Sequence, residues 1–184
     1  MKTLKQLSLI LLTSIVFTAC SNDDDAPEPV NEEEVITTMT VTLTPNAGGT
    51  DIVLQTQDLD GNGPDAPVVT VSGDLVAGTS YSGAIVLLNE TESPAEDITV
   101  EVEEEDVNHQ FFYTIGTGLN ASITYTNFDA NGNELGTEFT LITGAAGTGN
   151  LTFTLRHEPT KPNTGLSDAG GETDIEATFS LTIQ

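Results

Sequence analysis

The chain has 184 residues, of which 29 are acidic, four are lysine or arginine and two are histidine, giving a formal net charge of −25. This balance excludes nucleic acid as a partner, because nucleic-acid binding draws its affinity from the neutralisation of phosphates by lysine and arginine. Such a charge attracts cations and basic surfaces, although acidity also serves solubility alone. The single cysteine excludes an intrachain disulfide.

Residues 1–19 have the pattern of a lipoprotein signal peptide. Lys2 and Lys5 precede a short apolar run, and small residues lead to Cys20. This order is typical of secretory signals, and the apolar run is too short for a spanning helix. We therefore expect cleavage after Ala19 and a diacylglyceryl group on the Cys20 thiol, with acyl chains that anchor the protein in a membrane. The alternative is a secreted protein with a chance cysteine.

A serine and a cluster of acids follow the cysteine and resemble the export signal of surface lipoproteins of the Bacteroidota, which directs them to the outer face of the outer membrane. These residues are Ser21, Asp23, Asp24 and Asp25. The alternative is a polar spacer without a sorting role. Residues 20–34 are charged and lack an apolar pattern, which predicts a lipidated acidic tether. Residues 35–184 are enough for one domain with a hydrophobic core.

Most of this domain alternates apolar residues with threonine, which is typical of half-buried strands in antiparallel sheets. The pattern is clearest over residues 38–43, 151–157 and 175–183. Asp129–Asn133 has the composition of a hairpin connection. We predict a mainly β fold, an antiparallel immunoglobulin-like β-sandwich of about eight or nine strands with one short helix. The other expected strands are residues 51–57, 67–72, 80–88, 110–115, 121–127 and 137–143.

The expected helix begins at a capping box. Ser93 is a hydroxyl N-cap, Pro94 occupies the first helical position and Glu96 stands three residues after the cap. These residues predict a helix from Pro94 to about Asn108. The apolar residues within 98–102 fit the spacing of a helix, but they also alternate as in a strand, so a strand is the alternative.

The two histidines suggest a metal site. On the predicted helix Glu105 and His109 are four residues apart and share one side. His157 lies on the inward side of its strand, next to Glu158. Together these four residues would form a mixed nitrogen and oxygen site of the kind that zinc, iron or nickel accepts. Alternatively, His109 is favoured by a helix C-terminus and His157 completes the core.

A second candidate site is a calcium loop. Asp58, Asp60 and Asn62 match the first half of an EF-hand loop, in which alternate side chains supply oxygen to the ion. Val69 stands where the bidentate glutamate would be, which excludes an EF-hand. Asp65 is the remaining candidate ligand for a simpler calcium site. The alternative is a plain β-turn that needs no ion.

The sequence contains no nucleophile elbow, no phosphate-binding glycine loop and no zinc-protease motif, so we predict that the protein is not an enzyme. Four segments resemble a group of short Bacteroidota outer-membrane lipoproteins, and the likeness covers nearly the whole mature chain. They are residues 36–44, 109–112, 155–159 and 169–176. Members are often labelled as a type 1 periplasmic binding fold, which requires alternating strands and helices in two lobes and does not fit this sequence. The resemblance implies the lipid anchor and no particular activity.

We therefore predict a lipid-anchored binding protein at the outer-membrane surface, which captures a metal cation or small ligand for an outer-membrane receptor. The expected cofactor is a transition metal or calcium. The alternative is a structural or adhesive surface lipoprotein whose acidic face contacts a partner protein. The capture hypothesis requires His109 and His157 within reach of one ion, whereas the adhesive hypothesis leaves them apart.

Overall fold

A computed structural model describes residues 34–61 and 63–184 of the chain. The predicted signal peptide, Cys20, the export signal at Ser21 and Asp23–Asp25, and the tether up to residue 33 lie outside the described residues. Residues 33–184 form one compact unit. Within its described part, none of the helices has the length and apolarity needed to cross a membrane.

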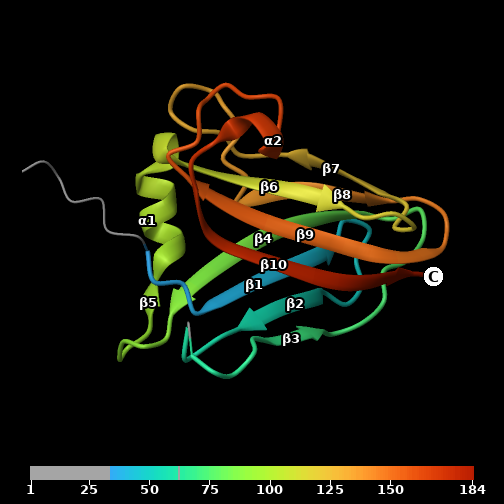
Figure 1. Ribbon diagram of the computed structural model, residues 1–184. Helices are drawn as coiled ribbons and strands as arrows, with labels where there is room; N and C mark the ends of the chain where they lie inside the picture. Colours follow the sequence, from blue (N-terminus) through green and yellow to red (C-terminus); the bar gives the residue numbers. More distant parts are fainter. Residues whose placement is uncertain (1–33, 62) are drawn as a thin grey trace, which may run out of the picture. The chain divides into compact units, whose positions relative to one another are not determined.

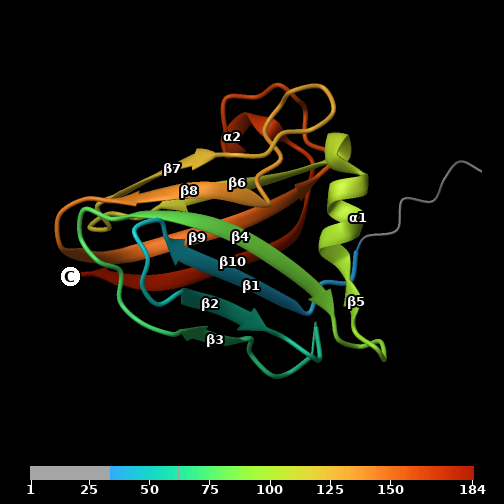
Figure 2. The same cartoon turned by 180° about the vertical axis from the view of Figure 1, so that it is seen from behind.

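Two antiparallel sheets form the domain, and they are seen with β9 and β10 in front in Figure 1 and with β4 in front in Figure 2. The seven-stranded sheet runs in the order β3 (Val68–Val71), β2 (Ile52–Gln57), β1 (Thr38–Pro45), β4 (Ser80–Asn89), β8 (Glu138–Thr143) and β7 (Ala121–Tyr125), and β5 (Glu96–Asp97) pairs with β4. The three-stranded sheet runs in the order β10 (Glu172–Ile183), β9 (Gly147–His157) and β6 (His109–Ile115).

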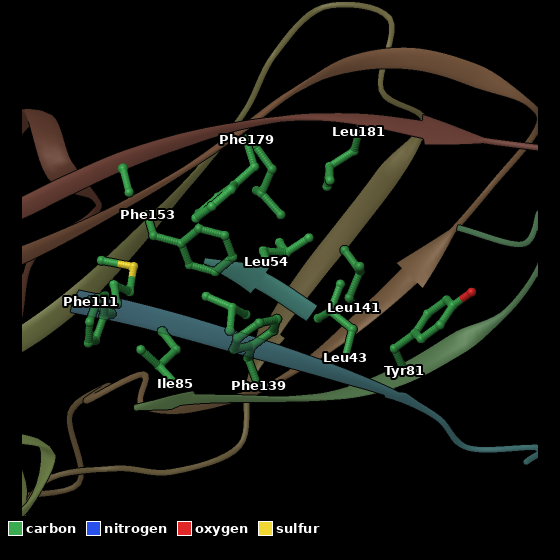
Figure 3. Packing of buried hydrophobic residues seen from close by; sticks show 14 of the residues in the cluster. Leu43, Leu54, Tyr81, Ile85, Phe111, Phe139, Leu141, Phe153, Phe179 and Leu181 are labelled. Atoms are coloured by element: carbon green, nitrogen blue, oxygen red, sulfur yellow. The ribbon is translucent and has the colours of Figure 1, made fainter. Parts of the chain in front are cut away.

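The core lies between these sheets, because each contributes the apolar side of its alternating strands. Phe139 of β8 and Phe153 of β9 meet across the two sheets, with ring centroids 5.8 Å apart. The Phe139 ring lies directly over Gly83, where a Cβ atom would be 2.3 Å from it. Figure 3 shows this packing; its buried members include Leu43, Leu54, Tyr81, Ile85, Phe111, Leu141, Phe179 and Leu181.

Strands account for 49% of the described residues and helices for 9%, which confirms the predicted mainly β, antiparallel sandwich. The predicted hairpin connection at Asp129–Asn133 joins β7 to β8, and Phe128 and Glu134 form a β-bridge at its base. One carboxylate oxygen of Asp129 accepts the backbone N–H groups of Asn131 and Asn133 and thereby shapes the turn.

The predicted helix from Pro94 to Asn108 begins later and ends earlier than expected. Helix α1 spans Ile98–Glu104, and a 3-10 turn, η1, follows at Asp106–Asn108. Asp97, not Ser93, is the N-cap and accepts the backbone N–H of Thr99 at 3.0 Å. The residues just before α1 pair with the end of β4 instead, so sheet pairing overrides the local capping signal.

The strand alternative for residues 98–102 is wrong. Ile98 and Val102 are buried, whereas Val100 between them is 52% exposed, as the spacing of a helix requires. Figure 1 shows α1 across one end of the sheets. The structure also contains a second helix, α2 (Leu166–Ala169), whereas we predicted only one. This single turn lies between Gly165 and Gly170 and is too short to show a helical period.

Candidate metal site

Four side chains that can bind a metal meet at the end of the sandwich beside α1 (Figure 1). Each of Glu34, His109, His157 and Asp174 offers one ligand atom, and these four atoms all lie within 4.8 Å of one another. The side chains are almost fully buried, at 3% exposure for Glu34 and His157, 1% for Asp174 and 0% for His109. We call this group the His109–His157 cluster.

The two histidines are cross-strand neighbours. His109 is the first residue of β6 and His157 is the last residue of β9, and the antiparallel register pairs them directly. Their side chains therefore leave the sheet on the same face, and the rings stack with centroids 4.7 Å apart and an angle of 23° between the planes. The sequence prediction that these two residues share a site depends on this register.

Asp174 enters the cluster through an irregularity in β10. Thr173 pairs with Arg156 and Ile175 pairs with Leu155, so Asp174 between them has no opposite residue. An extra residue of this kind is a β-bulge, which changes the direction of a side chain. Simple alternation with the inward Ile175 would have placed the Asp174 carboxylate in solvent.

Glu34 comes from the segment that precedes β1. One carboxylate oxygen, Oε1, lies 3.0 Å from His109 Nε2, and the other, Oε2, lies 3.7 Å from His157 Nδ1. Oε2 is buried and has no hydrogen-bond partner among the described residues. The carboxylate therefore bridges the two imidazoles.

Both ring nitrogens of His109 face oxygen acceptors. Nδ1 lies 3.2 Å from the backbone carbonyl oxygen of Glu105, and Nε2 lies 3.0 Å from Glu34 Oε1. A neutral imidazole has one N–H group and can donate to only one of these two oxygens. A second proton or a metal ion is needed to satisfy both contacts.

Burial opposes the proton. The pKa of His109 is lowered, mainly because the buried ring is poorly solvated when charged, and the nearby Glu34 carboxylate only partly offsets this effect. The carboxylates of Glu34 and Asp174 therefore lie beside two imidazoles in a buried place. A divalent cation would be attracted by these carboxylates and bound by the ligand atoms that face one another.

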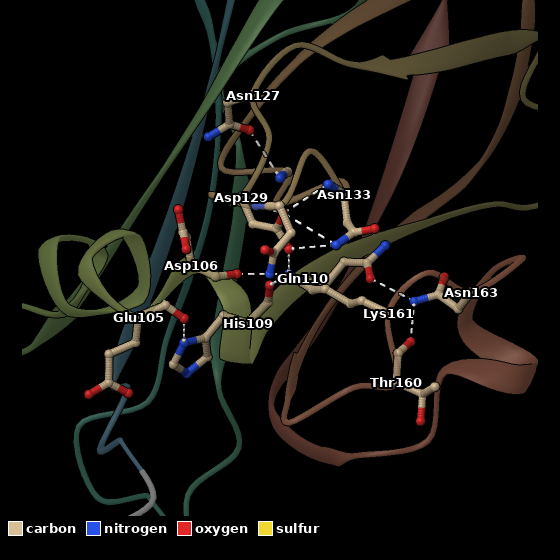
Figure 4. Close-up of polar contacts among 12 residues, drawn as sticks. Glu105, Asp106, His109, Gln110, Asn127, Asp129, Asn133, Thr160, Lys161 and Asn163 are labelled. Carbon is tan, nitrogen blue, oxygen red and sulfur yellow. Dashed lines mark hydrogen bonds and ion pairs between the residues drawn. The ribbon is translucent and has the colours of Figure 1, made fainter.

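The backbone that carries His109 is held by a buried lysine (Figure 4). Lys161 Nζ donates to the carbonyl oxygens of Asp106, at 2.7 Å, and of His109, and it also contacts Asp129 Oδ2 at 3.2 Å. Burial lowers the pKa of Lys161, and the Asp129 carboxylate opposes that shift. These contacts fix the junction of η1 and β6, and with it the position of the imidazole.

The spacing of the cluster fits a small ion with nitrogen and oxygen ligands. The shortest distances between an imidazole nitrogen and either oxygen of a carboxylate are 3.0, 3.7, 3.8 and 4.0 Å, and with one ligand atom from each residue all four atoms lie within 4.8 Å of one another. A tetrahedral zinc ion with bonds of about 2.0–2.2 Å places its ligand atoms roughly 3.3–3.6 Å apart. Calcium prefers six to eight oxygen ligands, so two histidines make it a poor match.

Of the residues predicted as metal ligands, the structure brings His109 and His157 together but leaves the carboxylates of Glu105 and Glu158 outside the cluster. Helix α1 ends before Glu105, so the expected spacing of four along one helix does not exist. Glu105 contributes its carbonyl oxygen instead, and in Figure 4 its carboxylate points away from the imidazole. Glu158 is exposed, at a positive φ of 48° just after β9.

Sequence reasoning missed the two carboxylates of the cluster. We assigned Glu34 to the tether because it ends a run of acids, and nothing in that run distinguishes it. Asp174 carried no signal either, because it alternates with Ile175 in the same way as Glu172 and Glu176 and so reads as an outward acid. Only the bulge in β10 turns it toward the histidines.

The predicted calcium loop gains no support. Asn62 lies outside the described residues, and the Asp60 carboxylate accepts the backbone N–H of Asp65 at 3.3 Å, as in an ordinary turn. Among the described residues, 34–61 and 63–184, one group of three or more potential ligands is close enough to share an ion. That group is the His109–His157 cluster, and Asp58 does not belong to it. Calcium binding at this loop stays a prediction.

Comparisons of the chain with protein-family models, with curated proteins and with solved structures found no match.

Proposed function

We propose that the protein is a lipid-anchored lipoprotein of the outer-membrane surface that binds a transition-metal ion in the His109–His157 cluster and delivers it to an outer-membrane receptor. Zinc is the ion that best fits the ligand set. The observation that carries the proposal is that both ring nitrogens of His109 face acceptors, Glu34 Oε1 at 3.0 Å and the Glu105 carbonyl oxygen at 3.2 Å, which a neutral imidazole alone cannot both satisfy. The anchor and the location rest on Cys20 and its flanking sequence alone.

A metal explains the buried charges better than an ion pair does. An imidazolium beside each carboxylate would also neutralise the cluster, but burial lowers the pKa of His109 and disfavours that form. Zinc binds imidazole in its neutral form, which is the form that burial favours for His109. The hydrogen bond from Nδ1 to the Glu105 carbonyl further orients the ring for a ligand at Nε2.

A second candidate is a structural or adhesive surface lipoprotein in which the ion is a permanent internal link. One observation favours it: all four side chains are at most 3% exposed, and structural zinc sites are closed by four protein ligands. In this case the ion would leave only when the domain unfolds. In the capture hypothesis the ion leaves the folded protein.

The test is zinc binding by the purified protein in a Cys20→Ser background, because a free thiol would itself bind zinc. We expect one equivalent of a transition metal by mass spectrometry in protein purified without chelator. A free ion at about 100 times its Kd stabilises the fold by about 2.7 kcal/mol, which for a domain of this size raises Tm by about 5–11 °C. Calcium should leave Tm unchanged.

Variants locate the site. His109→Ala and His157→Ala should each lose the zinc-dependent rise in Tm, whereas Glu105→Gln and Glu158→Gln should keep it, because those carboxylates lie outside the cluster. A zinc shift that survives in both histidine variants, or stabilisation by calcium alone, would overturn the proposal. Treating the loaded protein with a chelator then separates the two candidates, because only a capture protein loses its ion while it stays folded by circular dichroism.

A further inference from the structure

A cavity of about 410 Å³ lies against the His109–His157 cluster. One side is the segment that leads into β1, and another is the start of β10. Its lining residues include Glu34, Val35, Asp58, Asp174 and Glu176.

Two residues belong both to the cavity lining and to the cluster. Glu34 and Asp174 line the cavity, although their side chains are only 3% and 1% exposed. His109 and His157 do not line the cavity. An ion that comes from this side meets the two carboxylates first.

The cavity is also acidic beyond the cluster. Asp58 and Glu176 line it in addition to the two ligand carboxylates, and none of its described lining residues is basic. One oxygen of Glu176 accepts the hydroxyl of Thr154 at 3.0 Å, which fixes the direction of its carboxylate. A recess lined by charge of one sign concentrates counter-ions and raises the rate at which they associate.

We propose that this cavity is the route by which the metal ion reaches and leaves the site, and that Asp58 and Glu176 are positioning residues that attract the hydrated ion before Glu34 and Asp174 bind it. This inference rests on the proposed function. Carboxylates at the mouth replace part of the hydration shell, so the ion gives up its water in steps. The same charges repel anionic chelates, so the route favours the free cation.

The test is the rate of zinc association, measured by stopped flow in the Cys20→Ser background. We expect the double variant Asp58→Asn/Glu176→Gln to bind one zinc ion with an association rate constant about 3–10 times lower at low salt, and to approach the parent protein at high salt. The matched control is Asp51→Asn/Glu92→Gln, which removes two exposed acids outside the cavity and should change the rate less than twofold.

A second arm tests the route itself. Val35 is 55% exposed and lines the cavity, so Val35→Trp should obstruct it and slow zinc association and release by similar factors, leaving Kd nearly unchanged. Zinc binding at the parental rate in both the double variant and Val35→Trp would overturn the route and leave the proposed function intact. Absence of zinc binding by the parent protein would overturn both.

Discussion

Replacing Glu34 with glutamine should stabilise the metal-free protein while it weakens zinc binding. Glutamine has the shape of glutamate but no charge, and its amide NH₂ group can donate to His109 Nε2. The change therefore lets a neutral imidazole satisfy both of its contacts. A purely structural ion pair would respond in the opposite direction.

The magnitude follows from two contributions. The ligand oxygens of Glu34 and Asp174 lie within 4.8 Å of each other, and two unit charges at that distance repel by about 3.5 kcal/mol at an effective dielectric constant of about 20. The new hydrogen bond adds about 1 kcal/mol. Because relaxation of the site takes up part of the repulsion in the parent protein, we expect a net gain of about 1–3 kcal/mol, and a rise in Tm of roughly 2–4 °C per kcal/mol.

The assay is thermal and urea unfolding of the parent protein and Glu34→Gln, each with a chelator and again with saturating zinc. The variant should be the more stable protein with chelator and the less stable one with zinc. Glu92→Gln is the control, because this exposed loop residue should change stability by less than about 0.5 kcal/mol in either condition. A loss of 1 kcal/mol or more in metal-free Glu34→Gln would refute the reasoning, since it would mean that Glu34 accepts a hydrogen bond from a charged His109.

Two further predictions concern the scaffold. The pKa of Asp129 is lowered, because hydrogen bonds from the Asn133 backbone and side chain, Lys161 and the Asn131 backbone outweigh the opposing effect of burial. Its ionised form therefore stabilises the fold above a pH of about 4 and loses this effect as pH falls through the lowered pKa, so the stability gap between the parent protein and Asp129→Asn in urea unfolding should be smaller at pH 3 than at pH 7. Gly83→Ala would place a methyl group 2.3 Å from the buried Phe139 ring and should cost about 1–3 kcal/mol in the same assay, whereas Ala84→Ser on the exposed face should have little effect.

The fold could be predicted because its signal is repeated many times. Strands β1, β9 and β10 alternate apolar and polar residues over most of their length, so an error at one position does not change the assignment of the element. The start of α1 is different, because it depends on a single choice between two caps. Ser93 with Pro94 is a good local cap, but Glu96 and Asp97 gain backbone hydrogen bonds by pairing with β4. The residues around the cap do not indicate this pairing, because it depends on the position of β4 in the folded domain.

Only half of the site could be predicted, because its carboxylates, like the start of α1, depend on pairing between strands that are distant in sequence. His109 and His157 were recognisable because they are the only histidines in the chain, and their pairing follows from the antiparallel register of β6 and β9. The carboxylate partners were chosen from 29 acids by proximity in sequence, which selected Glu105 and Glu158. The actual partner on β10 depends on a bulge, and one inserted residue reverses the face on which a carboxylate lies.

The position of the cluster connects metal binding with the architecture of the domain. Three of its ligands belong to the three-stranded sheet, whereas Glu34 belongs to the segment that leads into β1 of the other sheet. An ion in the cluster would therefore link the two sheets, and its binding free energy would add to the stability of the fold. Glu34 is also the described residue that lies nearest in sequence to Cys20. Release of the ion would thus loosen the domain at the end that leads to the predicted anchor, where the cavity and its acids lie.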